Sequence, residues 1–444
     1  VGLETLLQNT GPRPFRALKV SINTLNSAWK RTGSQRRSFR TSGILSRQPL
    51  PVTKLCFSLF LSVEFQLSKQ YGPVFSIQMG PQKTVVLTGY ETVKEALVNQ
   101  ADAFADRPII PMFQELAQGF GESYLCIGNP FETTTIMNAA VANIIVALLL
   151  DKRFDYEDPT YIRLLKLVNE NIRLTIKQNR DELFAFINAT FIKHLRDLDE
   201  NDQRSFIDSF LIQQQEVMES FKLEKKKKTN AYFHNENLKA VVANLFGAGV
   251  ETTSTTLRWG LLLMMKYPEI QSELKVQEEI AKVVGSSQPR IEHRTKMPYT
   301  DAVVHEIQRF ANIVPTNLPH ATATDVTLNG YFIPKGTHII PLLSSVLHDE
   351  SQWEKPHKFY PEHFLNSEGK FVKRDAFMPF SAGRRACLGE TLAKTELFLF
   401  FTSLLQGFTF QPPPGTSQED LDLTPAVGLT TSPMPHQLCA LPRF

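Results

Sequence analysis

Apolar side chains recur at helical spacing through the middle of the chain. Between about residues 131 and 285 they return every three or four positions, which predicts a largely helical region. One long helix is predicted over 237–267, because Pro268 cannot continue it. A last helix is predicted over 387–406, with Gly407 as its stop. Helices therefore make up most of the predicted fold.

Short β-branched runs predict a smaller amount of strand. The runs 74–79 and 84–87 flank a Gly-Pro turn and predict a hairpin, and a short helix is predicted over 91–99. Between 325 and 340, turn signals such as Asn329-Gly330 separate further short strands. The predicted fold class is mainly α with a minor β-sheet region.

No apolar run reaches the length of a membrane-spanning helix. Such a helix needs about 20 consecutive apolar residues. The nearest run, 139–150, is shorter and is interrupted by Asn143, so it is expected to be a core helix. A conventional membrane anchor is not predicted from the sequence as given.

The composition excludes several classes of protein. The chain has 48 Lys and Arg against 45 Asp and Glu, a net charge of +3. This charge is too small for nucleic-acid binding along the whole chain. A hydrophobic fraction of 42% over 444 residues can fill a large core and excludes general disorder. The four cysteines, Cys56, Cys126, Cys387 and Cys439, are too sparse for a disulfide scaffold. This fits a chain in a reducing compartment, in which one cysteine can have a special role.

The first 66 residues differ from the rest in charge. Up to residue 63 the only acidic residue is Glu4, against ten Lys and Arg. Residues 1–66 are therefore predicted to be a basic, disordered extension, and residues 67–444 the catalytic domain. Such a segment is typical of a mitochondrial transit peptide or of an arm that touches anionic membrane. A mis-joined stretch without selected function is an equal alternative.

The strongest chemical signal is the segment 380–389, Phe-Ser-Ala-Gly-Arg-Arg-Ala-Cys-Leu-Gly. Cys387 stands at the predicted start of a helix, where the helix dipole and Arg385 favour the thiolate. Gly383 lets the backbone approach a flat partner closely. Since no second ligand lies nearby in the sequence, a lone thiolate suits haem iron better than zinc.

This segment resembles the haem-binding signature of the cytochrome P-450 monooxygenases, F-x-x-G-x-R-x-C-x-G. The resemblance implies the cytochrome P-450 fold and haem b, with Cys387 as the axial thiolate of the iron. It also implies that Arg385 contacts a haem propionate and that Phe380 and Gly383 belong to the haem-binding loop.

A second signature lies in the long predicted helix. Ala248 and Thr252 are four residues apart and share a face, so the Thr hydroxyl can bond the Ala carbonyl. Alone, this pattern is more often a packing kink than a site. It resembles the family's oxygen-activating helix, which implies that Thr252 and Glu251 deliver protons and that Ala248 lies against haem.

Two further signatures follow in family order. Glu306 and Arg309 could form an ordinary surface pair. They resemble the family's buried E-x-x-R, whose third member here is His363 in place of Arg, which makes the triad pH-sensitive in principle. His320 is either a surface residue or, by resemblance, a propionate contact.

Several segments resemble the vertebrate microsomal family 2, whose members oxidise xenobiotics and fatty acids. The resemblance implies an apolar small-molecule substrate, NADPH-derived electrons from NADPH–cytochrome P-450 reductase, and cytochrome b5 as a second partner. It implies the cytoplasmic face of the endoplasmic reticulum membrane, with mitochondrion as the alternative. The implied substrate pocket, any member of which could equally be plain core, comprises Ile110, Phe113, Phe246, Ala248, Ile313 and Val314.

The chain also departs from the family. The family carries a helix with a W-x-x-x-R motif, and both residues of that motif bind haem propionates. None of the tryptophans Trp29, Trp259 and Trp353 has Arg four residues later. Two regions are shorter than the family needs. One is the stretch after Gly121, and the other is 169–206, which would form the lid over the pocket. The fold is therefore expected to be incomplete.

These departures leave three hypotheses open. The first is a haem-thiolate monooxygenase that inserts one oxygen atom from O2 into apolar substrates. The second is a non-catalytic or mis-spliced remnant with impaired haem binding. The third, an isomerase or dehydratase on the same scaffold, is disfavoured by Glu251 and Thr252, because such enzymes need no oxygen-linked proton relay.

Overall fold

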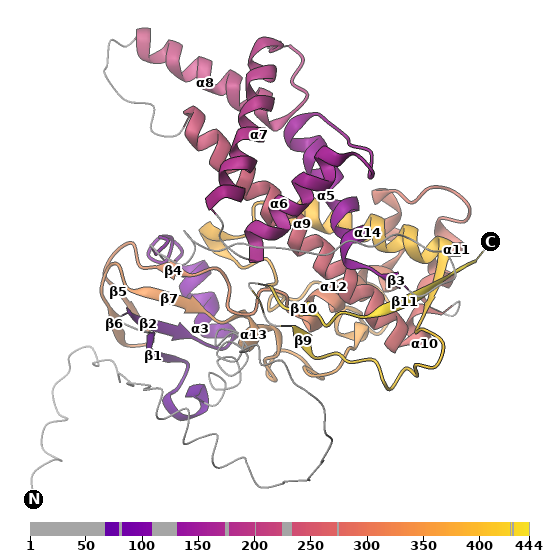
Figure 1. Ribbon diagram of the computed structural model, residues 1–444. Coiled ribbons are helices and arrows are strands. Elements are labelled where there is room, and N and C mark those ends of the chain that lie inside the picture. Colours follow the sequence, from indigo (N-terminus) through magenta and orange to yellow (C-terminus); the bar gives the residue numbers. More distant parts are fainter. Residues whose placement is uncertain are drawn as a thin grey trace, which may run out of the picture. The chain divides into compact units, whose positions relative to one another are not determined.

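The computed structural model describes residues 67–79, 82–108, 131–173, 177–199, 201–223, 233–272, 275–426, 428 and 430–443 (Figure 1). The described residues form two compact units. The first unit contains the described residues up to 108 together with 314–359 and 373–387. The second unit contains 131–313, 360–372 and 388–443, apart from the gaps given above. The predicted extension 1–66 lies outside the described residues.

A four-stranded sheet organises the first unit. Its order is β1 (Val74–Met79), β2 (Gln82–Leu87), β7 (His338–Pro341) and β4 (His320–Ala321). The predicted hairpin is confirmed: β1 and β2 pair antiparallel, with Val74 opposite Leu87. Strand β2 then pairs in parallel with β7, and β7 pairs antiparallel with β4. This topology brings two segments that are more than 200 residues apart in the sequence into one sheet.

The remaining elements of the first unit are short. The helix predicted over 91–99 is two pieces, since the α-helix α3 widens into a π-helical turn, η1. Helix α3 begins where the Asp349 carboxylate accepts a hydrogen bond of 3.1 Å from the Tyr90 amide. The elements are α3 (Tyr90–Lys94), η1 (Glu95–Asn99), β5 (Val326–Leu328), β6 (Tyr331–Ile333), α13 (Leu343–Leu347) and η4 (Gly383–Arg385).

Gly383 of η4 lies very close to the backbone of η1. Its φ is +72°, and a Cβ atom added there would lie 1.6 Å from the carbonyl oxygen of Leu97. This glycine therefore allows η4 to pack against η1. Its close approach to a flat partner stays a prediction.

We expect Gly383→Ala to destabilise the protein far more than Gly336→Ala. Gly336 has a similar φ of +77° but nothing within 4 Å of an added Cβ, so its substitution adds only backbone strain of about 1–2 kcal/mol. Urea unfolding of both variants measures the difference. If both variants lost the same free energy of unfolding, the close contact with Leu97 would add nothing to the cost of a Cβ atom at Gly383.

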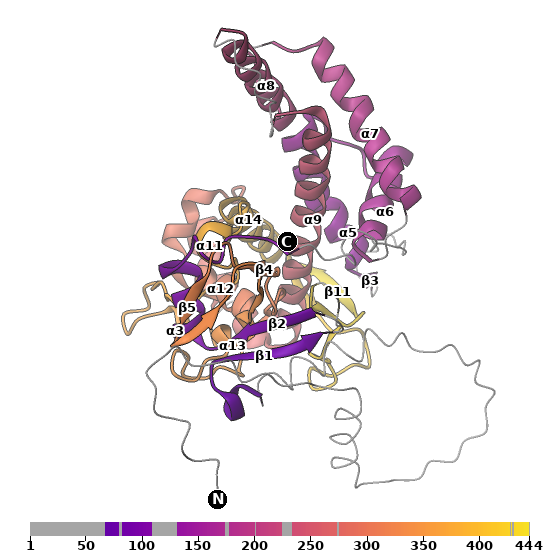
Figure 2. The same ribbon diagram turned by 90° about the vertical axis from the view of Figure 1, so that its left-hand side faces the viewer.

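Helices dominate the second unit, as predicted, and α9 runs through it. Figure 2 shows α5 to α7 on one side of α9 and α11, α12 and α14 on the other. The helices are α5 (Thr134–Leu150), α6 (Pro159–Arg173), α7 (Lys177–Arg196), α8 (Phe206–Leu223), α9 (Asn235–Lys266), α10 (Pro268–Gln271), α11 (Val276–Val283), α12 (Pro298–Ala311) and α14 (Glu390–Gly407), with 3-10 turns η2 (Ile291–Lys296) and η3 (Pro361–Phe364).

Small antiparallel sheets complete this unit. Strand β11 (Gln437–Pro442) lies between β3 (Phe131–Glu132) and β8 (Phe408–Gln411). Strands β9 (Pro425–Ala426) and β10 (Ser432–Pro433) form a separate pair. The fold class is thus mainly α with minor sheets, as the sequence predicted.

The long helix α9 is amphipathic only in its first half. From Leu257 to Met265 every residue is buried, because the helix there is enclosed by α12 and α14. The predicted end at Pro268 is confirmed, since α9 stops at Lys266 and Pro268 begins α10. A buried helix that is held on several sides is a rigid support for residues earlier on it.

The interruption of the apolar run in α5 also has a structural reason. The amide of Asn143 donates to the Phe154 carbonyl at 3.0 Å, and its oxygen accepts from the Phe154 amide at 2.9 Å. The side chain therefore satisfies a backbone that returns against the helix. Among the described residues, no helix is long and apolar enough to cross a membrane.

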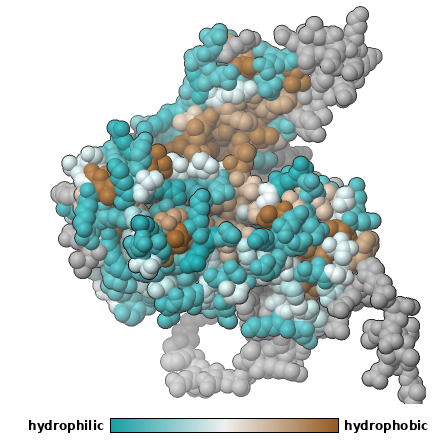
Figure 3. All heavy atoms as spheres, turned by 180° about the vertical axis from the view of Figure 1, so that it is seen from behind, coloured by the Kyte–Doolittle hydropathy of each residue, from teal (hydrophilic) through white to brown (hydrophobic). Residues whose placement is uncertain are grey.

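Apolar side chains also reach the surface of the second unit. Figure 3 shows a broad apolar area on the upper half of the rear face. Among the described side chains of α5, α6 and α7, the exposed large apolar ones include Leu148, Ile162, Ile192 and Leu195. A broad apolar area such as the one in Figure 3 is typical of contacts with membranes or other proteins.

Glu396 of α14 is a buried carboxyl group. It is 4% exposed, and its Oε1 atom has no hydrogen-bond partner among the described residues. Burial raises its pKa from the usual 4.5 to about 7, and a hydrogen bond with Thr253 offsets only part of this effect. The folded protein therefore holds this proton more tightly than the unfolded chain does.

We expect this group to make stability fall as pH rises. The contribution is full below pH 4.5 and is lost between pH 4.5 and about 7, by about 3 kcal/mol at most. Glu396→Gln, which mimics the neutral acid, should be more stable than the parent protein at pH 8 and similar at pH 5. Denaturant unfolding at both pH values checks this. A variant that tracks the parent at both would mean that Glu396 does not titrate in this range.

Candidate functional site

The loop that carries Cys387 is closed by its own backbone. The Cys387 amide donates to the Phe380 carbonyl at 2.9 Å, and the Ala386 amide donates to the Gly383 carbonyl at 3.1 Å. The prediction that Cys387 opens the last helix is wrong, because α14 begins only at Glu390, with Gly389 as its N-cap. Cys387 is an exposed residue at the end of this loop.

His320 lies in the same unit and is deeply buried. It is 1% exposed, so the surface alternative is wrong. Its Nδ1 atom lies 2.7 Å from the Phe104 carbonyl oxygen and donates to it. Its Nε2 atom is buried and has no hydrogen-bond partner among the described residues. Burial above all, and then Arg107 and Arg385, lower its pKa to about 4.

Two arginines share the environment of His320. Arg107 donates through Nη1 to the carbonyls of Leu318 and Pro319, at 3.1 and 2.7 Å. Arg385 donates through Nε to the Ala105 carbonyl at 2.5 Å. Burial, and then Arg385, lower the pKa of Arg107. His320, Arg107 and Arg385 can all carry positive charge, and they lie close enough to influence one another's pKa. No carboxylate is among the groups that shift the pKa of His320 or Arg107.

Backbone pairing brings these three residues together. The amides of Asp106 and Ala321 each donate to the other's carbonyl, at 3.2 and 2.7 Å, and the Ala323 amide donates to the Ala103 carbonyl at 2.7 Å. The segment before Arg107 thus lies along β4. Sequence reasoning missed Arg107, because only this long-range pairing relates it to His320.

These residues fit a haem with two acidic propionates. Buried polar atoms in folded proteins almost always have partners, so the unpartnered Nε2 atom of His320 indicates a ligand. Its cationic neighbours indicate that the ligand is an anion, which would also raise the pKa of His320. Cys387, on the loop that contains Arg385, carries a thiol group, and a cysteine thiolate is one of the ligands that hold haem iron in proteins.

The second unit carries the other predicted chemical group. Thr252 donates through its hydroxyl to the Ala248 carbonyl at 2.8 Å, as the spacing of these two residues predicted. The Glu251 carboxylate accepts a hydrogen bond of 3.1 Å from the Thr430 hydroxyl. Sequence reasoning did not find Thr430, since it lies far along the chain in the C-terminal segment.

Glu306, Arg309 and His363 form a buried cluster. Arg309 donates to both carboxylate oxygens of Glu306, each at 2.8 Å, and both side chains are fully buried. His363, on the turn η3, places Nδ1 3.2 Å from the same carboxylate, and the Tyr360 amide donates to it at 2.8 Å. The surface-pair alternative is therefore wrong, and the pair joins α12 to η3.

The predicted pocket residues have different surroundings. Ile110 and Phe113 lie outside the described residues. Phe246 is 4% exposed and lines a cavity of only about 10 Å³ among the apolar side chains of α5, α6 and α7. Ile313 and Val314 are half-buried, in the second and first unit respectively. The position of Phe246 favours the core alternative for that residue.

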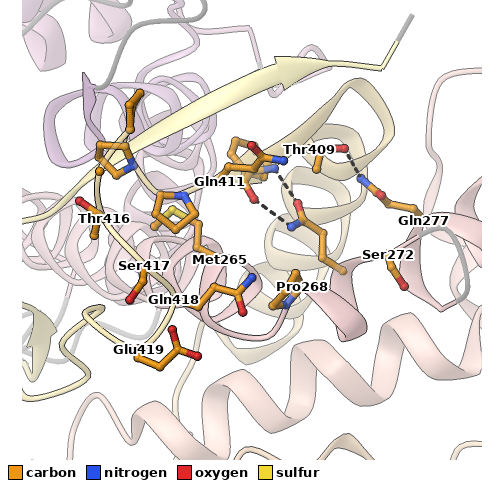
Figure 4. A pocket seen from close by; sticks show the side chains of 16 residues that line it. Met265, Pro268, Ser272, Gln277, Thr409, Gln411, Thr416, Ser417, Gln418 and Glu419 are labelled. Carbon is orange, nitrogen blue, oxygen red and sulfur yellow. Dashed lines mark hydrogen bonds between the residues drawn. The ribbon is translucent and has the colours of Figure 1, made fainter.

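A larger hollow of about 830 Å³ opens beside α10 and the loop that follows β8 (Figure 4). Gln271 donates to the Phe410 carbonyl and accepts from its amide, at 3.0 and 2.7 Å. Gln277 donates to the Thr409 hydroxyl at 3.3 Å. These amides hold strand β8, and the walls are largely polar or proline. The hollow does not suit an apolar substrate.

Comparison with known proteins identifies the family. The family model described as cytochrome P-450 matches residues 55–127 and 171–440. Cytochrome P-450 2K6 of Danio rerio is 46% identical, over 85% of this chain and 86% of its own length. Cytochrome P-450 2K1 of Oncorhynchus mykiss is 45% identical over 89% of this chain and 91% of its own, and cytochrome P-450 2C5 of Oryctolagus cuniculus is 40% identical over 85% and 88%.

The chain is also shorter than one of these relatives over the aligned region. The match to cytochrome P-450 2C23 of Rattus norvegicus extends over 504 positions, whereas this chain has 444 residues. At least 60 positions, the difference between 504 and 444, therefore have no counterpart here. The chain is therefore shorter than this relative over the aligned region. The chain belongs to the cytochrome P-450 family, whose haem-thiolate monooxygenases take electrons from NADPH through a redox partner.

Proposed function

We propose that Cys387 binds the haem iron of this monooxygenase and that Arg107, His320 and Arg385 hold the haem propionates. The observation that carries this proposal is the buried, unpartnered Nε2 atom of His320 beside two arginines. When bound, haem supplies the activation of O2, while the protein supplies binding, orientation and protons. Phe380 and Gly383 shape the loop that presents Cys387.

The reaction needs two electrons and two protons for each oxygen molecule. One oxygen atom enters the substrate and the other leaves as water, and NADPH is oxidised to NADP+. We propose that Glu251 takes protons from solvent and that Thr252 orients their delivery, with Ala248 beside them. The Thr252 hydroxyl already bonds the Ala248 carbonyl, which supports an orienting role.

The cluster of Glu306, Arg309 and His363 serves structure in this proposal. Its side chains are engaged with one another and with backbone, and none of them is available to a substrate. The remnant alternative gains no support, because the residues that carry the chemistry are present and bonded as described above. In this proposal Arg107, His320 and Arg385 hold the propionates in a chain whose sequence lacks the W-x-x-x-R motif.

Arg107→Gln should lower the haem content of the purified protein. Loss of one charge-assisted hydrogen bond to a propionate costs about 1.5–3 kcal/mol, roughly 10- to 100-fold in affinity. Arg107→Lys keeps the charge and should retain more haem. Haem per polypeptide, measured after titration of the apoprotein, checks this.

Arg384→Gln is the matched control for this experiment. Arg384 bonds the exposed Asp102 at 2.6 Å, with side chains 67% and 80% exposed. Its loss should leave haem content unchanged. Equal haem content in the Arg107→Gln and Arg384→Gln proteins would refute the assignment of Arg107.

We further propose an apolar organic substrate, such as a xenobiotic or a fatty acid, met by Ile110, Phe113, Ala248, Ile313 and Val314. The proposed redox partner is NADPH–cytochrome P-450 reductase, with cytochrome b5 as a second electron donor. The proposed location is the cytoplasmic face of the endoplasmic reticulum membrane. The exposed apolar side chains of α5 to α7 support contact with a membrane surface. Fractionation of cells that express a tagged chain distinguishes this from the mitochondrion.

A further inference from the structure

Glu251 is held by a residue from the far end of the chain. Its Oε1 atom accepts a hydrogen bond of 3.1 Å from the Thr430 hydroxyl and a longer contact of 3.5 Å from Thr255. Thr255 lies one turn further along α9, whereas Thr430 is 179 residues away in sequence. Thr430 is 8% exposed, so water competes little for its hydroxyl. This bond is the firmer of the two.

The neighbouring residue fixes the backbone that carries Thr430. The Thr431 amide donates to the Ile313 carbonyl at 2.9 Å, and the Thr431 hydroxyl donates to the Asn312 carbonyl at 2.9 Å. The Thr431 carbonyl in turn accepts from the indole of Trp259 at 2.9 Å. Thr431 and Trp259 are 4% and 2% exposed.

These bonds tie the segment to two helices of the same unit. Trp259 belongs to the buried half of α9, and Asn312 is the C-cap of α12. The segment before β10 is therefore supported from both sides. A hydroxyl on a backbone fixed in this way has a defined direction.

We propose that Thr430 is a positioning residue for proton delivery by Glu251. Its hydroxyl occupies Oε1 and sets the rotamer of the carboxylate. Oε2 is then the oxygen that takes up a proton and releases it toward Thr252. The inference rests on the proposed role of Glu251, and it adds the residue that orients the Glu251 carboxylate.

The bond matters because two outcomes compete for the same electrons. In the coupled reaction, substrate, O2, two electrons and two protons give hydroxylated product and water. In the uncoupled reaction, O2, two electrons and two protons give hydrogen peroxide, and the substrate is unchanged. A misdirected carboxylate favours the second outcome without changing substrate binding.

The test compares Thr430→Val, which keeps the shape but loses the hydroxyl, with Thr430→Ser, which keeps the hydroxyl. Haem-loaded enzyme with its reductase is assayed for product and hydrogen peroxide per NADPH consumed. We expect Thr430→Val to lower the product-to-peroxide ratio roughly five-fold, the effect of one hydrogen bond, with an unchanged KM for substrate. Thr430→Ser should restore the ratio.

A second measurement does not depend on turnover. Carbodiimide modification of Glu251, followed by mass spectrometry of the resting protein, reports how firmly the carboxylate is held. The modification rate should rise several-fold in Thr430→Val and return in Thr430→Ser. If the two variants behave alike in both measurements, Thr430 acts only through its shape, and the inference is overturned.

Glu251→Gln separates this inference from the proposal beneath it. If Glu251→Gln leaves coupling unchanged, the proposed role of Glu251 itself fails. If Glu251→Gln lowers coupling but Thr430→Val does not, only the role of Thr430 fails. When both hold, the double variant should be no worse than Glu251→Gln alone, since the two residues act through one carboxylate.

Discussion

Cys387→Ser should abolish the thiolate-type Soret band that we expect from the reduced, haem-loaded protein with carbon monoxide. A serine hydroxyl stays protonated near neutral pH and cannot replace the thiolate as an electron-donating ligand. Monooxygenase activity should fall at least about 100-fold with it, since electron donation from sulfur assists cleavage of the O–O bond. The absorption spectrum of the purified variant, after haem addition, checks the first effect directly.

Cys439→Ala is the control for this substitution. Cys439 is 6% exposed within β11, where it packs as a small apolar residue. Its substitution should cost about 1 kcal/mol of stability and leave the band intact. Retention of the band in Cys387→Ser would end the assignment of Cys387, whatever the activity shows.

Glu306→Ala should cost about 3–5 kcal/mol of unfolding free energy, the second largest effect expected. The substitution removes the carboxylate that accepts two bonds from Arg309, and leaves a cation buried at 0% exposure. It also removes the acceptor of the Tyr360 amide. Denaturant unfolding of the haem-free protein measures the loss without a contribution from haem binding.

Glu278→Ala serves as the matched control. Glu278 pairs with Lys282 at 2.6 Å on α11, but the two side chains are 40% and 71% exposed. Such a pair contributes about 0.3–0.5 kcal/mol. The double variant Glu306→Met with Arg309→Met should recover part of the loss, because it leaves no buried charge unpaired. Similar losses for Glu306→Ala and Glu278→Ala would contradict the buried position of the cluster.

The helical part of the fold could be predicted from local pattern alone. The extents of α9 and the β1–β2 hairpin follow from apolar spacing, a proline and a turn, all of which act within a few residues. The start of α14 could not be predicted this way. The hydrogen bonds of the loop hold Cys387 outside the helix, and apolar spacing does not record them.

The candidate site was predictable only where a motif carries it. Cys387, Thr252 and Glu306 lie in short local patterns, whereas Arg107 and Thr430 acquire their roles through partners more than 170 positions away. Phe246 shows the reverse case. From the sequence alone, an aromatic residue on a helix can belong either to the core or to a pocket lining. Only its neighbours in the structure distinguish the two.

Strand β11 has a consequence for how the polypeptide is made. Its first residues, Gln437 and Leu438, pair with Glu132 and Phe131, and its last residues pair with β8. Strand β3 is therefore synthesised long before β11, and it can pair only after β11 has left the ribosome. Until then the backbone of β3 lacks this strand partner. A premature stop codon before β11 would remove the strand that pairs with both β3 and β8.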